Sequence, residues 1–445
     1  MTDSRKKTKK ISAFQYIILG FIGVILAGAL LLMLPIASQT REVTPFADTL
    51  FTSVSASCVT GLIVLDTASH WSAFGQAVIL ILIQTGGLGV VTVAASLSMI
   101  AGRKINLIQR DTMAESVSAP QLGGIVKITK FIIKTAFTIE LSGALLMMYP
   151  MIKKYGAAGI WKSVFVSVSA FCNAGFDLMG TAHAKFVSLT PFADDPIVVL
   201  VICFLIISGG IGFFTWDDIK DNGFRFHRYR MQSKTIIVTS AVLIAIPLLL
   251  YFFIDYSDEP LKERLLYSLF QAVTPRTAGF NTSDYTQLTG GGRAVMICLM
   301  LTGGAPGSTA GGMKVTTVAV LFSNMVATFR RREDGIIFRR RISPDITKKA
   351  PTVLFMYILA FVSSAIIISD IEGLPLTDCL FETASAVGTV GLTLGLTPSL
   401  GMISRGILIV LMYLGRVGAL TFIYAAVPKS DKQSDSYPHE RISVG

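Results

Sequence analysis

Few side chains of this chain can bind a metal ion or form a disulfide bond. Its 445 residues include five cysteines and four histidines, and no two cysteines form a CxxC pair. A structural zinc site and a disulfide framework are therefore not expected. Cys58 and Cys172 occupy matching positions of a repeat described below, where we expect them to be small packing residues.

Charged residues are also scarce. Only 15% of the residues are charged, whereas 52% are hydrophobic. This is the composition of an integral membrane protein rather than of a water-soluble domain. The net charge of +11 is concentrated in the termini and in short links between apolar segments. It therefore does not indicate a nucleic-acid-binding surface.

Enzyme motifs are absent as well. The chain has no HExxH, no GxSxG and no pair of aspartates inside an apolar segment. The run from Gly307 to Lys314 approaches the phosphate-loop pattern GxxxxGK[ST], but Met313 intervenes and Val315 replaces the Ser or Thr. An enzyme and a nucleotide-binding protein are disfavoured, and no organic cofactor is expected in this chain.

Long apolar runs are abundant. Eight of them approach or exceed the length of about 20 residues that crosses a bilayer. They are 11–37, 73–100, 125–150, 195–216, 233–255, 291–327, 350–369 and 401–427. The first is too long for a cleavable signal sequence, so we interpret it as a membrane-spanning helix. The chain is therefore expected to be an all-α, multi-pass protein of the plasma membrane.

Lysine and arginine are distributed unevenly along the chain. The two termini and the links 101–130, 217–234 and 328–349 hold 26 of the 39. The positive-inside rule then assigns the N-terminus 1–10 and the C-terminal tail 428–445 to the cytoplasm. The arginine-rich stretch 330–341 is either a plain topology signal or a surface for anionic lipid or an acidic partner.

One short pattern occurs four times, each time between two apolar runs. It ends at Gly61, Gly175, Gly279 and Gly391, at intervals of 114, 104 and 112 residues, and Leu or Phe follows each glycine. Non-helical backbone at membrane depth is tolerated only where protein buries it or where it lines water. The alternative is that each glycine marks a helix-packing contact.

The pattern predicts a fourfold pseudo-symmetric architecture around one central pore. Each unit is a helix, a re-entrant pore loop and a second helix, which gives eight membrane-spanning helices. The expected repeats are 11–100, 125–216, 233–327 and 350–427.

The chemistry expected of the four loops is the replacement of a cation's hydration shell by backbone carbonyls. Glycine permits the φ/ψ values that aim successive carbonyls at one axis. The predicted selectivity filter consists of Cys58, Val59, Thr60, Gly61, Cys172, Asn173, Ala174, Gly175, Arg276, Thr277, Ala278, Gly279, Gly388, Thr389, Val390 and Gly391. The carbonyls expected to hold K⁺ are those of Val59, Thr60, Asn173, Ala174, Thr277, Ala278, Thr389 and Val390. We expect the side chain of Arg276 to point away from the axis.

The sixth apolar run is interrupted by glycine and proline at a density that no helix tolerates. We interpret this stretch, 302–314, as a gate across the inner path, or alternatively as a passive kink. The candidate gate residues are Gly303, Gly304, Ala305, Pro306, Gly307, Ser308, Thr309, Ala310, Gly311, Gly312, Lys314 and Arg416.

Arg416 lies midway along the last apolar run, where a charge indicates function by default. It could repel a cation or hold the gate through backbone carbonyls, and Lys314 could act in a similar way. The alternatives are that Arg416 extends toward the membrane surface or forms a buried pair with Glu140 or Glu382.

Together, the four glycine motifs, the stretch 303–312 and Arg416 resemble the potassium transporter superfamily that includes the Trk, Ktr and plant HKT proteins. The resemblance covers residues 11 to 427. Eight spans without an additional N-terminal pair resemble most closely the KtrB-like membrane subunits of bacterial Ktr systems.

The resemblance implies uptake of K⁺ through a gated pore. Gly61, at a position where serine accompanies sodium preference in plant members, implies K⁺ as the transported ion. The resemblance further implies a homodimer, a cytosolic KtrA-like ring of nucleotide-binding regulatory subunits, and Na⁺ as an activator. A sodium-permeable or Na⁺-coupled transporter of the same superfamily stays open, and an intramembrane enzyme is a distant alternative.

Overall fold

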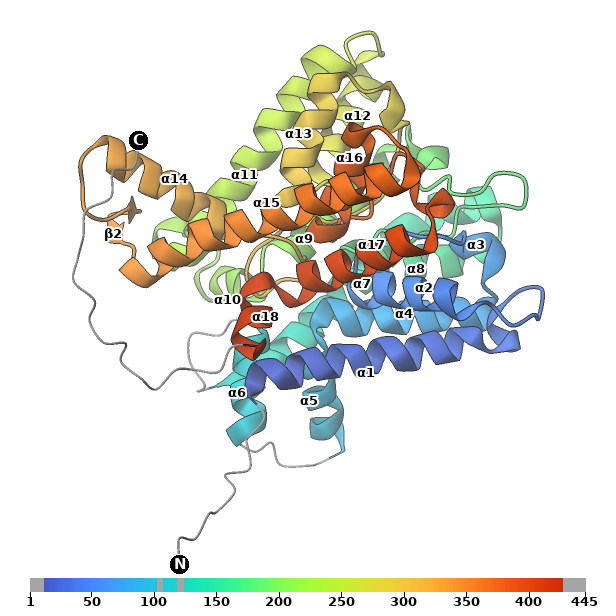
Figure 1. The fold of residues 1–445 in the computed structure, drawn as a ribbon, viewed down its shortest axis with the longest axis horizontal. Helices are drawn as coiled ribbons and strands as arrows, with labels where there is room; N and C mark the ends of the chain where they lie inside the picture. Colours follow the sequence, from blue (N-terminus) through green and yellow to red (C-terminus); the bar gives the residue numbers. More distant parts are fainter. Residues whose placement is uncertain (1–11, 102–106, 118–123, 427–445) are drawn as a thin grey trace, which may run out of the picture.

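The computed structural model describes residues 12–101, 107–117 and 124–426 of the chain. The expected cytoplasmic N-terminus 1–10 and tail 428–445 lie outside the described residues. Almost every regular element is a helix (Figure 1). The predicted all-α class therefore holds for the described part of the chain, apart from one small hairpin.

Four of the described helices are long and apolar enough to cross a membrane. They are α1 (Ala13–Met33), α7 (Ile125–Tyr155), α15 (Pro344–Glu372) and α11 (Met231–Leu250), which a π-helical turn extends through Tyr251–Asp255. Only 22–33% of the most apolar window of each is buried within the protein. The remaining surface of these helices is available to lipid.

A short helix follows each long helix and packs against it. The short helices are α2 (Phe46–Ser57), α8 (Ala158–Phe171), α12 (Leu261–Val273) and α16 (Leu376–Gly388). They contain 12 to 14 residues. At about 1.5 Å per residue they cover roughly 20 Å, less than the ~30 Å hydrocarbon layer.

Three of the expected spans are sharply bent, a feature that the sequence interpretation did not include. The runs 73–100, 195–216 and 401–427 each contain two helices that meet at 98°, 97° and 90°, respectively. These pairs are α4 (Ala73–Leu88) with α5 (Val90–Ile100), α9 (Pro196–Gly210) with α10 (Phe213–Asn222), and α17 (Met402–Val417) with α18 (Ala419–Ala426).

A glycine stands at each bend. Gly89, Gly212 and Gly418 have φ angles of +88°, +88° and +90°. Residues with a Cβ disfavour this conformation, so glycine is what allows the abrupt turn. If each bent pair is counted as one span, up to seven segments of the described chain are suited to a membrane.

The sixth expected span is interrupted, as the glycine and proline content predicts. Helix α13 (Gly290–Leu301) ends before the stretch 302–314, and α14 (Val315–Phe329) begins after it. The backbone N–H of Gly303 donates to the carbonyl of Met313 at 2.8 Å, which draws the two ends of the stretch together.

The remaining elements are short links. They are α3 (Thr67–His70), α6 (Leu107–Ser116), the antiparallel hairpin of β1 (Ile336–Ile337) and β2 (Arg340–Arg341), and 3₁₀ turns at Pro35–Ala37, Thr190–Phe192, Phe226–Arg228, Tyr285–Gln287 and Thr397–Ser399.

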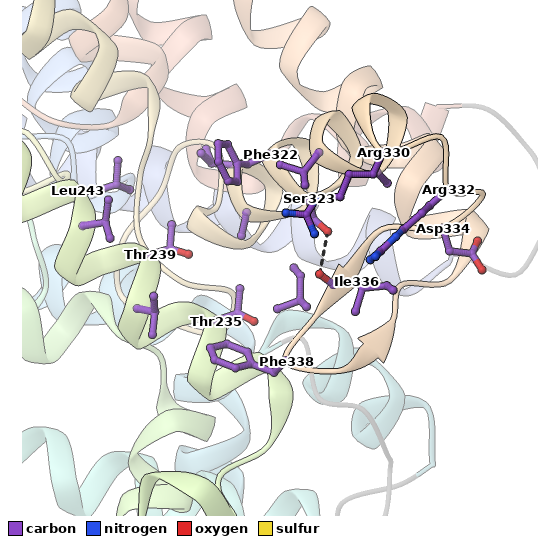
Figure 2. A pocket seen from close by; sticks show the side chains of 17 residues that line it. Thr235, Thr239, Leu243, Phe322, Ser323, Arg330, Arg332, Asp334, Ile336 and Phe338 are labelled. Atoms are coloured by element: carbon purple, nitrogen blue, oxygen red, sulfur yellow. Dashed lines mark hydrogen bonds between the residues drawn. The ribbon is translucent and has the colours of Figure 1, made fainter.

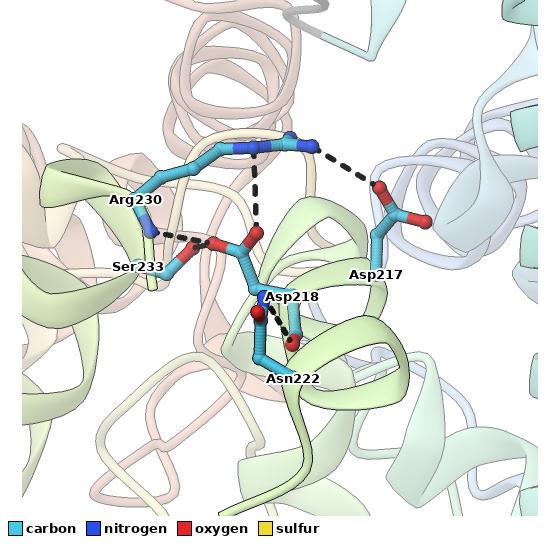
Figure 3. Close-up of polar contacts among 5 residues, drawn as sticks. All are labelled: Asp217, Asp218, Asn222, Arg230 and Ser233. Atoms are coloured by element: carbon cyan, nitrogen blue, oxygen red, sulfur yellow. Dashed lines mark hydrogen bonds and ion pairs between the residues drawn. The ribbon is translucent and has the colours of Figure 1, made fainter. Parts of the chain in front are cut away.

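The link between α10 and α11 is fixed by a buried carboxylate (Figure 3). Asp218 accepts hydrogen bonds from the backbone N–H of Arg230 at 3.1 Å and from the hydroxyl of Ser233 at 2.5 Å. The side chain of Arg230 pairs with Asp218 at 3.3 Å and with Asp217 at 3.4 Å. A negative charge at a helix N-terminus is stabilising, so Asp218 sets where α11 begins.

Candidate ion path

The glycines that end the four motifs are distant in the sequence but adjacent in space. Each of the first three contacts the glycine of the next motif along the chain. A Cβ atom placed on Gly61 would meet the carbonyl oxygen of Ala174 at 2.5 Å and the Cα of Gly175 at 3.1 Å. A Cβ on Gly175 would meet the carbonyl oxygen of Ala278 at 2.8 Å and the Cα of Gly279 at 2.9 Å. The second and third loops therefore follow the first around a common centre.

The fourth loop closes the circle. A Cβ on Gly279 would meet the carbonyl oxygen of Val390 and, at 3.3 Å, the Cα of Gly391. A Cβ on Gly391 would meet the carbonyl oxygen of Thr60 and, at 2.9 Å, the Cα of Gly61. We call these four glycines the glycine ring. At each step, the absence of a side chain allows the carbonyl of a neighbouring loop to approach.

The backbone of all four loops has the same unusual conformation. The residue two positions before each ring glycine has a positive φ, although none of the four is glycine. These residues are Val59, Asn173, Thr277 and Thr389, with φ of 51°, 58°, 68° and 52°. Such a conformation costs of order 1–3 kcal/mol per residue and persists only where the surroundings impose it.

Hydrogen bonds to the preceding short helix impose this conformation. The N–H groups of Thr60, Ala174 and Val390 donate to carbonyls five residues earlier, each at 2.8 Å. In the first and fourth loops, the next N–H, that of the ring glycine, donates to the hydroxyl of Ser55 at 3.1 Å or of Ser385 at 3.0 Å.

The residue after each ring glycine anchors its loop in the protein interior. These residues are Leu62, Phe176, Phe280 and Leu392, and each has at most 1% of its surface exposed. This burial explains why a large apolar residue follows the glycine in every copy of the motif. The loops are therefore held on both sides of the ring.

The third loop differs from the other three through Arg276. Its guanidinium donates to the carbonyl of Ser240 at 3.3 Å and to the hydroxyl of Ser240 at 2.9 Å, both on the outer helix α11. The side chain thus extends from its loop toward α11, the direction expected from the sequence. The side-chain amide of Asn173 hydrogen-bonds the Thr277 hydroxyl at 3.1 Å and joins the second loop to the third.

Two buried glutamates support the loops, and the sequence interpretation missed this. Glu140 on α7 accepts from the amide of Gln84 at 3.0 Å, and the thiol of Cys172 lies 3.4 Å from the same Gln84 side chain. Glu382 accepts from the hydroxyls of Thr393 and Thr397, on the chain that follows the fourth ring glycine. An acid inside the apolar run 125–150 is the signal that could have identified Glu140. Glu382 lies outside the eight apolar runs and carries no such signal.

The 302–314 segment lies against the ring loops. A Cβ on Gly312 would meet the carbonyl oxygen of Gly388 at 2.9 Å, and a Cβ on Gly311 would meet Cγ2 of Thr389 at 3.0 Å. The hydroxyl of Thr309 donates to the carbonyl of Phe171 at 3.0 Å, at the end of the short helix α8. The segment therefore touches the fourth loop directly and the end of α8, from which the second loop continues.

Broken helices provide most of the partners of this segment. The last carbonyls of a helix have no partner within that helix. Those of Gly209 and Gly210, at the end of α9, accept from the N–H groups of Thr309 at 3.2 Å and Ala305 at 2.8 Å. The carbonyl of Gly415, near the end of α17, accepts from the N–H of Gly312 at 3.1 Å.

Arg416 uses the same kind of acceptor. Its guanidinium donates to the carbonyl of Thr309 in the segment and to the carbonyls of Gly86 and Gly87 near the end of α4. The amine of Lys314 donates to the carbonyl of Ala310 at 2.8 Å. Within the described residues, neither cation is within salt-bridge distance of a carboxylate. The alternative of a pair with Glu140 or Glu382 is therefore wrong, because both glutamates are satisfied by other donors.

A second glycine motif escaped the sequence interpretation. It reads Gly86-Gly87-Leu88-Gly89, Gly209-Gly210-Ile211-Gly212 and Gly415-Arg416-Val417-Gly418, and the 302–314 segment begins with Gly303-Gly304 at the corresponding place. Arg416 thus stands where the other three copies have glycine. The signal was present in the sequence but lay inside continuous apolar runs.

A cavity of about 490 Å³ borders the segment. Its lining includes Lys314, Arg416 and Tyr357, but none of the ring glycines. Asp177 follows Gly175 by two residues and accepts from the N–H of Met179 at 2.8 Å. Burial, reinforced by the nearby Asp66, raises the pKa of Asp177 to about 6, although the N–H of Met179 and the charge of Lys162 oppose this shift.

The described part of the chain contains no cluster of metal-binding side chains. No group of three or more His, Cys, Asp or Glu side chains there is arranged to hold a metal ion.

Comparisons with known proteins agree over the full length. The family model described as "TrkH: Cation transport protein" matches residues 2–436. The chain is 38% identical to the Potassium/sodium uptake protein NtpJ of Enterococcus hirae, over 100% of both chains. It is also 38% identical to the Ktr system potassium uptake protein B of Bacillus subtilis, over 97% of this chain and 96% of the other.

A solved structure has the same fold. The potassium transporter TrkH from Vibrio parahaemolyticus superposes with a TM-score of 0.75, covers 95% of this chain and 86% of its own, and is 18% identical in sequence.

Proposed function

Since the chain belongs to the TrkH family of cation transport proteins, we propose that it takes up potassium ions across the plasma membrane through a channel-like pore. The observation that carries this proposal is the closed ring of Gly61, Gly175, Gly279 and Gly391. Its relatives are uptake and transport proteins, so the chain is a transporter and not an enzyme.

In this proposal the ring loops are the selectivity filter. An ion that enters loses its water and gains the carbonyls of Val59, Thr60, Asn173, Ala174, Thr277, Ala278, Thr389 and Val390. Carbonyl dipoles attract a cation without the full charge that would trap it. The short helices end at the ring, so their negative C-terminal ends favour a cation there as well.

We propose four helix–loop–helix repeats around this filter, with both termini in the cytoplasm. The basic links support this orientation through the positive-inside rule. A membrane potential then supplies the driving force, at about 2.3 kcal/mol per charge for each 100 mV. No hydrolytic step within this chain is needed for accumulation of the ion.

The 302–314 segment is proposed as the gate. It lies against the ring loops, and Arg416 holds it through the carbonyl of Thr309. Opening requires that the segment gives up its hydrogen bonds to α9 and α17. Arg416 and Lys314 also add positive charge beside the path, which opposes a cation until the segment moves.

The names of the Ktr relatives support a proposal of regulation from the cytosol. The Bacillus subtilis relative is named as part of a Ktr system, and we propose that this chain likewise works as a homodimer with a cytosolic, KtrA-like nucleotide-binding ring that acts on the gate. Na⁺ is proposed as an activator.

A sodium-permeable or Na⁺-coupled transporter is the second candidate. The specific observation in its favour is the relative from Enterococcus hirae, which is named for both potassium and sodium uptake and is as similar as the Ktr protein. The glycine ring is compatible with both ions.

Uptake of ⁸⁶Rb⁺ into liposomes that contain the purified protein tests the proposal. We expect rapid uptake that excess external Na⁺ does not compete away in the wild type, and reduced selectivity in Gly279→Ser, because the new side chain meets the backbone of Gly391. Gly290→Ser is the control, since no atom lies within 4 Å of the added Cβ. Equal selectivity of Gly279→Ser and wild type would overturn the filter assignment, and strong competition by Na⁺ in the wild type would favour the second candidate.

A further inference from the structure

A large groove lies between α11, α14 and the hairpin of β1 and β2, and no residue of a ring loop lines it (Figure 2). Its volume is about 650 Å³, within the range of about 300–1,000 Å³ that is typical of ligand sites. Residues 235–243 form one wall, residues 318–327 form the second, and residues 336–338 close one end. It shares no lining residue with the cavity beside Arg416.

The walls of the groove are apolar and accessible. Val238, Val242 and Phe322 are 43%, 47% and 64% exposed although they line it. These residues lie on α11, which is apolar enough to span the membrane, and on α14. The groove therefore opens to the hydrocarbon region and suits an alkyl chain.

One end of the groove is positively charged. Arg330 and Arg332 line that end and are exposed. The hairpin's acid, Asp334, lies 3.8 Å from Arg341, whereas Arg330 and Arg332 form no ion pair in the described part of the chain. Their guanidinium groups are free to bind a phosphate, whose geometry matches the arginine fork.

We propose that this groove binds one anionic phospholipid, with an acyl chain between α11 and α14 and the phosphate on Arg330 and Arg332. The apolar wall accounts for the chain and the two arginines for the preference for a negative headgroup. The groove shares no lining residue with the ring or with the 302–314 segment, so lipid binding at the groove can be measured separately from ion uptake.

Charge disfavours a second copy of this chain as the occupant. Six arginines lie between residues 330 and 341. A twofold interface through the groove would bring two such clusters toward each other, which is repulsive. A lipid phosphate instead neutralises the charge and leaves the apolar wall covered.

Native mass spectrometry of the purified full-length protein tests this site. The protein is presented with equal amounts of palmitoyl-oleoyl phosphatidylglycerol and palmitoyl-oleoyl phosphatidylcholine in detergent. We expect the wild type to retain one phosphatidylglycerol per chain, with a preference on the order of tenfold over phosphatidylcholine. Arg330→Gln with Arg332→Gln should abolish the preference, and Ala319→Phe, which fills the groove, should remove the bound lipid.

Two matched controls make the result specific. Arg339→Gln with Arg340→Gln removes the same charge from exposed hairpin residues that do not line the groove. Ala245→Phe adds the same ring to an exposed position of α11 outside the groove. Both controls should bind like the wild type.

Three results would overturn the proposal. An equal loss in the two double arginine variants would indicate general surface charge. Unchanged binding in Ala319→Phe would place the lipid elsewhere. A change from dimer to monomer in Ala319→Phe without loss of lipid would make the groove a contact between copies.

Discussion

The glycine ring and the 302–314 segment are both rich in small residues and non-helical, but they are anchored differently. Each ring loop is tied to its own short helix by backbone hydrogen bonds and to the core by a buried Leu or Phe. The segment is tied mainly to the ends of other helices, α9 and α17, and to one cation, Arg416. The ring is therefore built to keep its shape, whereas the segment can be released without unfolding its own helices.

The largest effect is expected from breaking the ring. Gly391→Ala places a methyl group against the carbonyl of Thr60 and 2.9 Å from the Cα of Gly61. We expect at least about a tenfold loss of ⁸⁶Rb⁺ uptake, since contact and backbone strain together exceed about 1.4 kcal/mol.

Gly395→Ala is the matched control for this change. Its φ of +90° is nearly that of Gly391, at +92°, but no atom lies within 4 Å of the added Cβ. Equal losses in the two variants would show that backbone strain alone, and not the ring contact, is responsible.

Release of the 302–314 segment should raise ⁸⁶Rb⁺ uptake instead of lowering it. Arg416→Gly gives the fourth copy of the second glycine motif the residue found in the other copies, and it removes the guanidinium donors to Thr309, Gly86 and Gly87. Hydrogen bonds from a charged group contribute about 1.5–3 kcal/mol each. Uptake without any activator should rise on the order of tenfold.

The control for Arg416 is on the same helix. Arg405→Gln removes a cation that pairs with Asp48 at 2.9 Å and does not touch the segment. It should leave basal uptake near the wild-type value. Lower uptake in Arg416→Gly, at unchanged thermal stability, would contradict the proposal that Arg416 holds the 302–314 segment in the closed position.

A smaller rise is expected from Thr309→Val. The change keeps the shape of the side chain but removes the hydroxyl that donates to Phe171 at 3.0 Å. One such bond contributes about 1 kcal/mol, so basal uptake should rise roughly fivefold. Ser308→Ala, which removes a bond to Ala305 within the segment, should have little effect. The reverse order would contradict a link between segment and ring.

The smallest effect on basal uptake is expected at the helix bends, and it should differ between Gly212 and Gly418. A Cβ on Gly212 would lie 2.9 Å from the carbonyl oxygen of Pro306 in the segment, whereas one on Gly418 has no neighbour closer than 3.8 Å. Both have φ near +90°, so the backbone strain is matched. Basal uptake should rise about two- to threefold in Gly212→Ala and stay unchanged in Gly418→Ala. Equal basal uptake in the two variants would show that the contact between Gly212 and the segment does not affect uptake.

The sequence was sufficient for the family and for the class of protein. The membership in the Trk and Ktr superfamily, predicted from the four glycine motifs, is confirmed by the family model and by relatives over the whole chain. The interruption of the sixth span was also predictable, because glycine and proline cannot sustain a helix there.

The bends at Gly89, Gly212 and Gly418 were missed for a physical reason. The chain on both sides of each bend is apolar, so hydropathy gives no sign that the helix turns by about a right angle. The α4 partners of Arg416 were missed in consequence, because the carbonyls of Gly86 and Gly87 become available only where α4 ends. A bond from Arg416 to a carbonyl of the segment, here that of Thr309, was one of the roles expected from the sequence.

The most direct test of the central claim is to locate the ion. Crystals grown in Rb⁺ in place of K⁺ should give an anomalous difference peak at the centre of the glycine ring, in contact with the carbonyls of Thr60, Ala174, Ala278 and Val390. In the Gly391→Ala variant this peak should weaken or disappear. A ring without a peak, with Rb⁺ ordered elsewhere in the membrane region, would contradict the assignment of the four loops as the ion path.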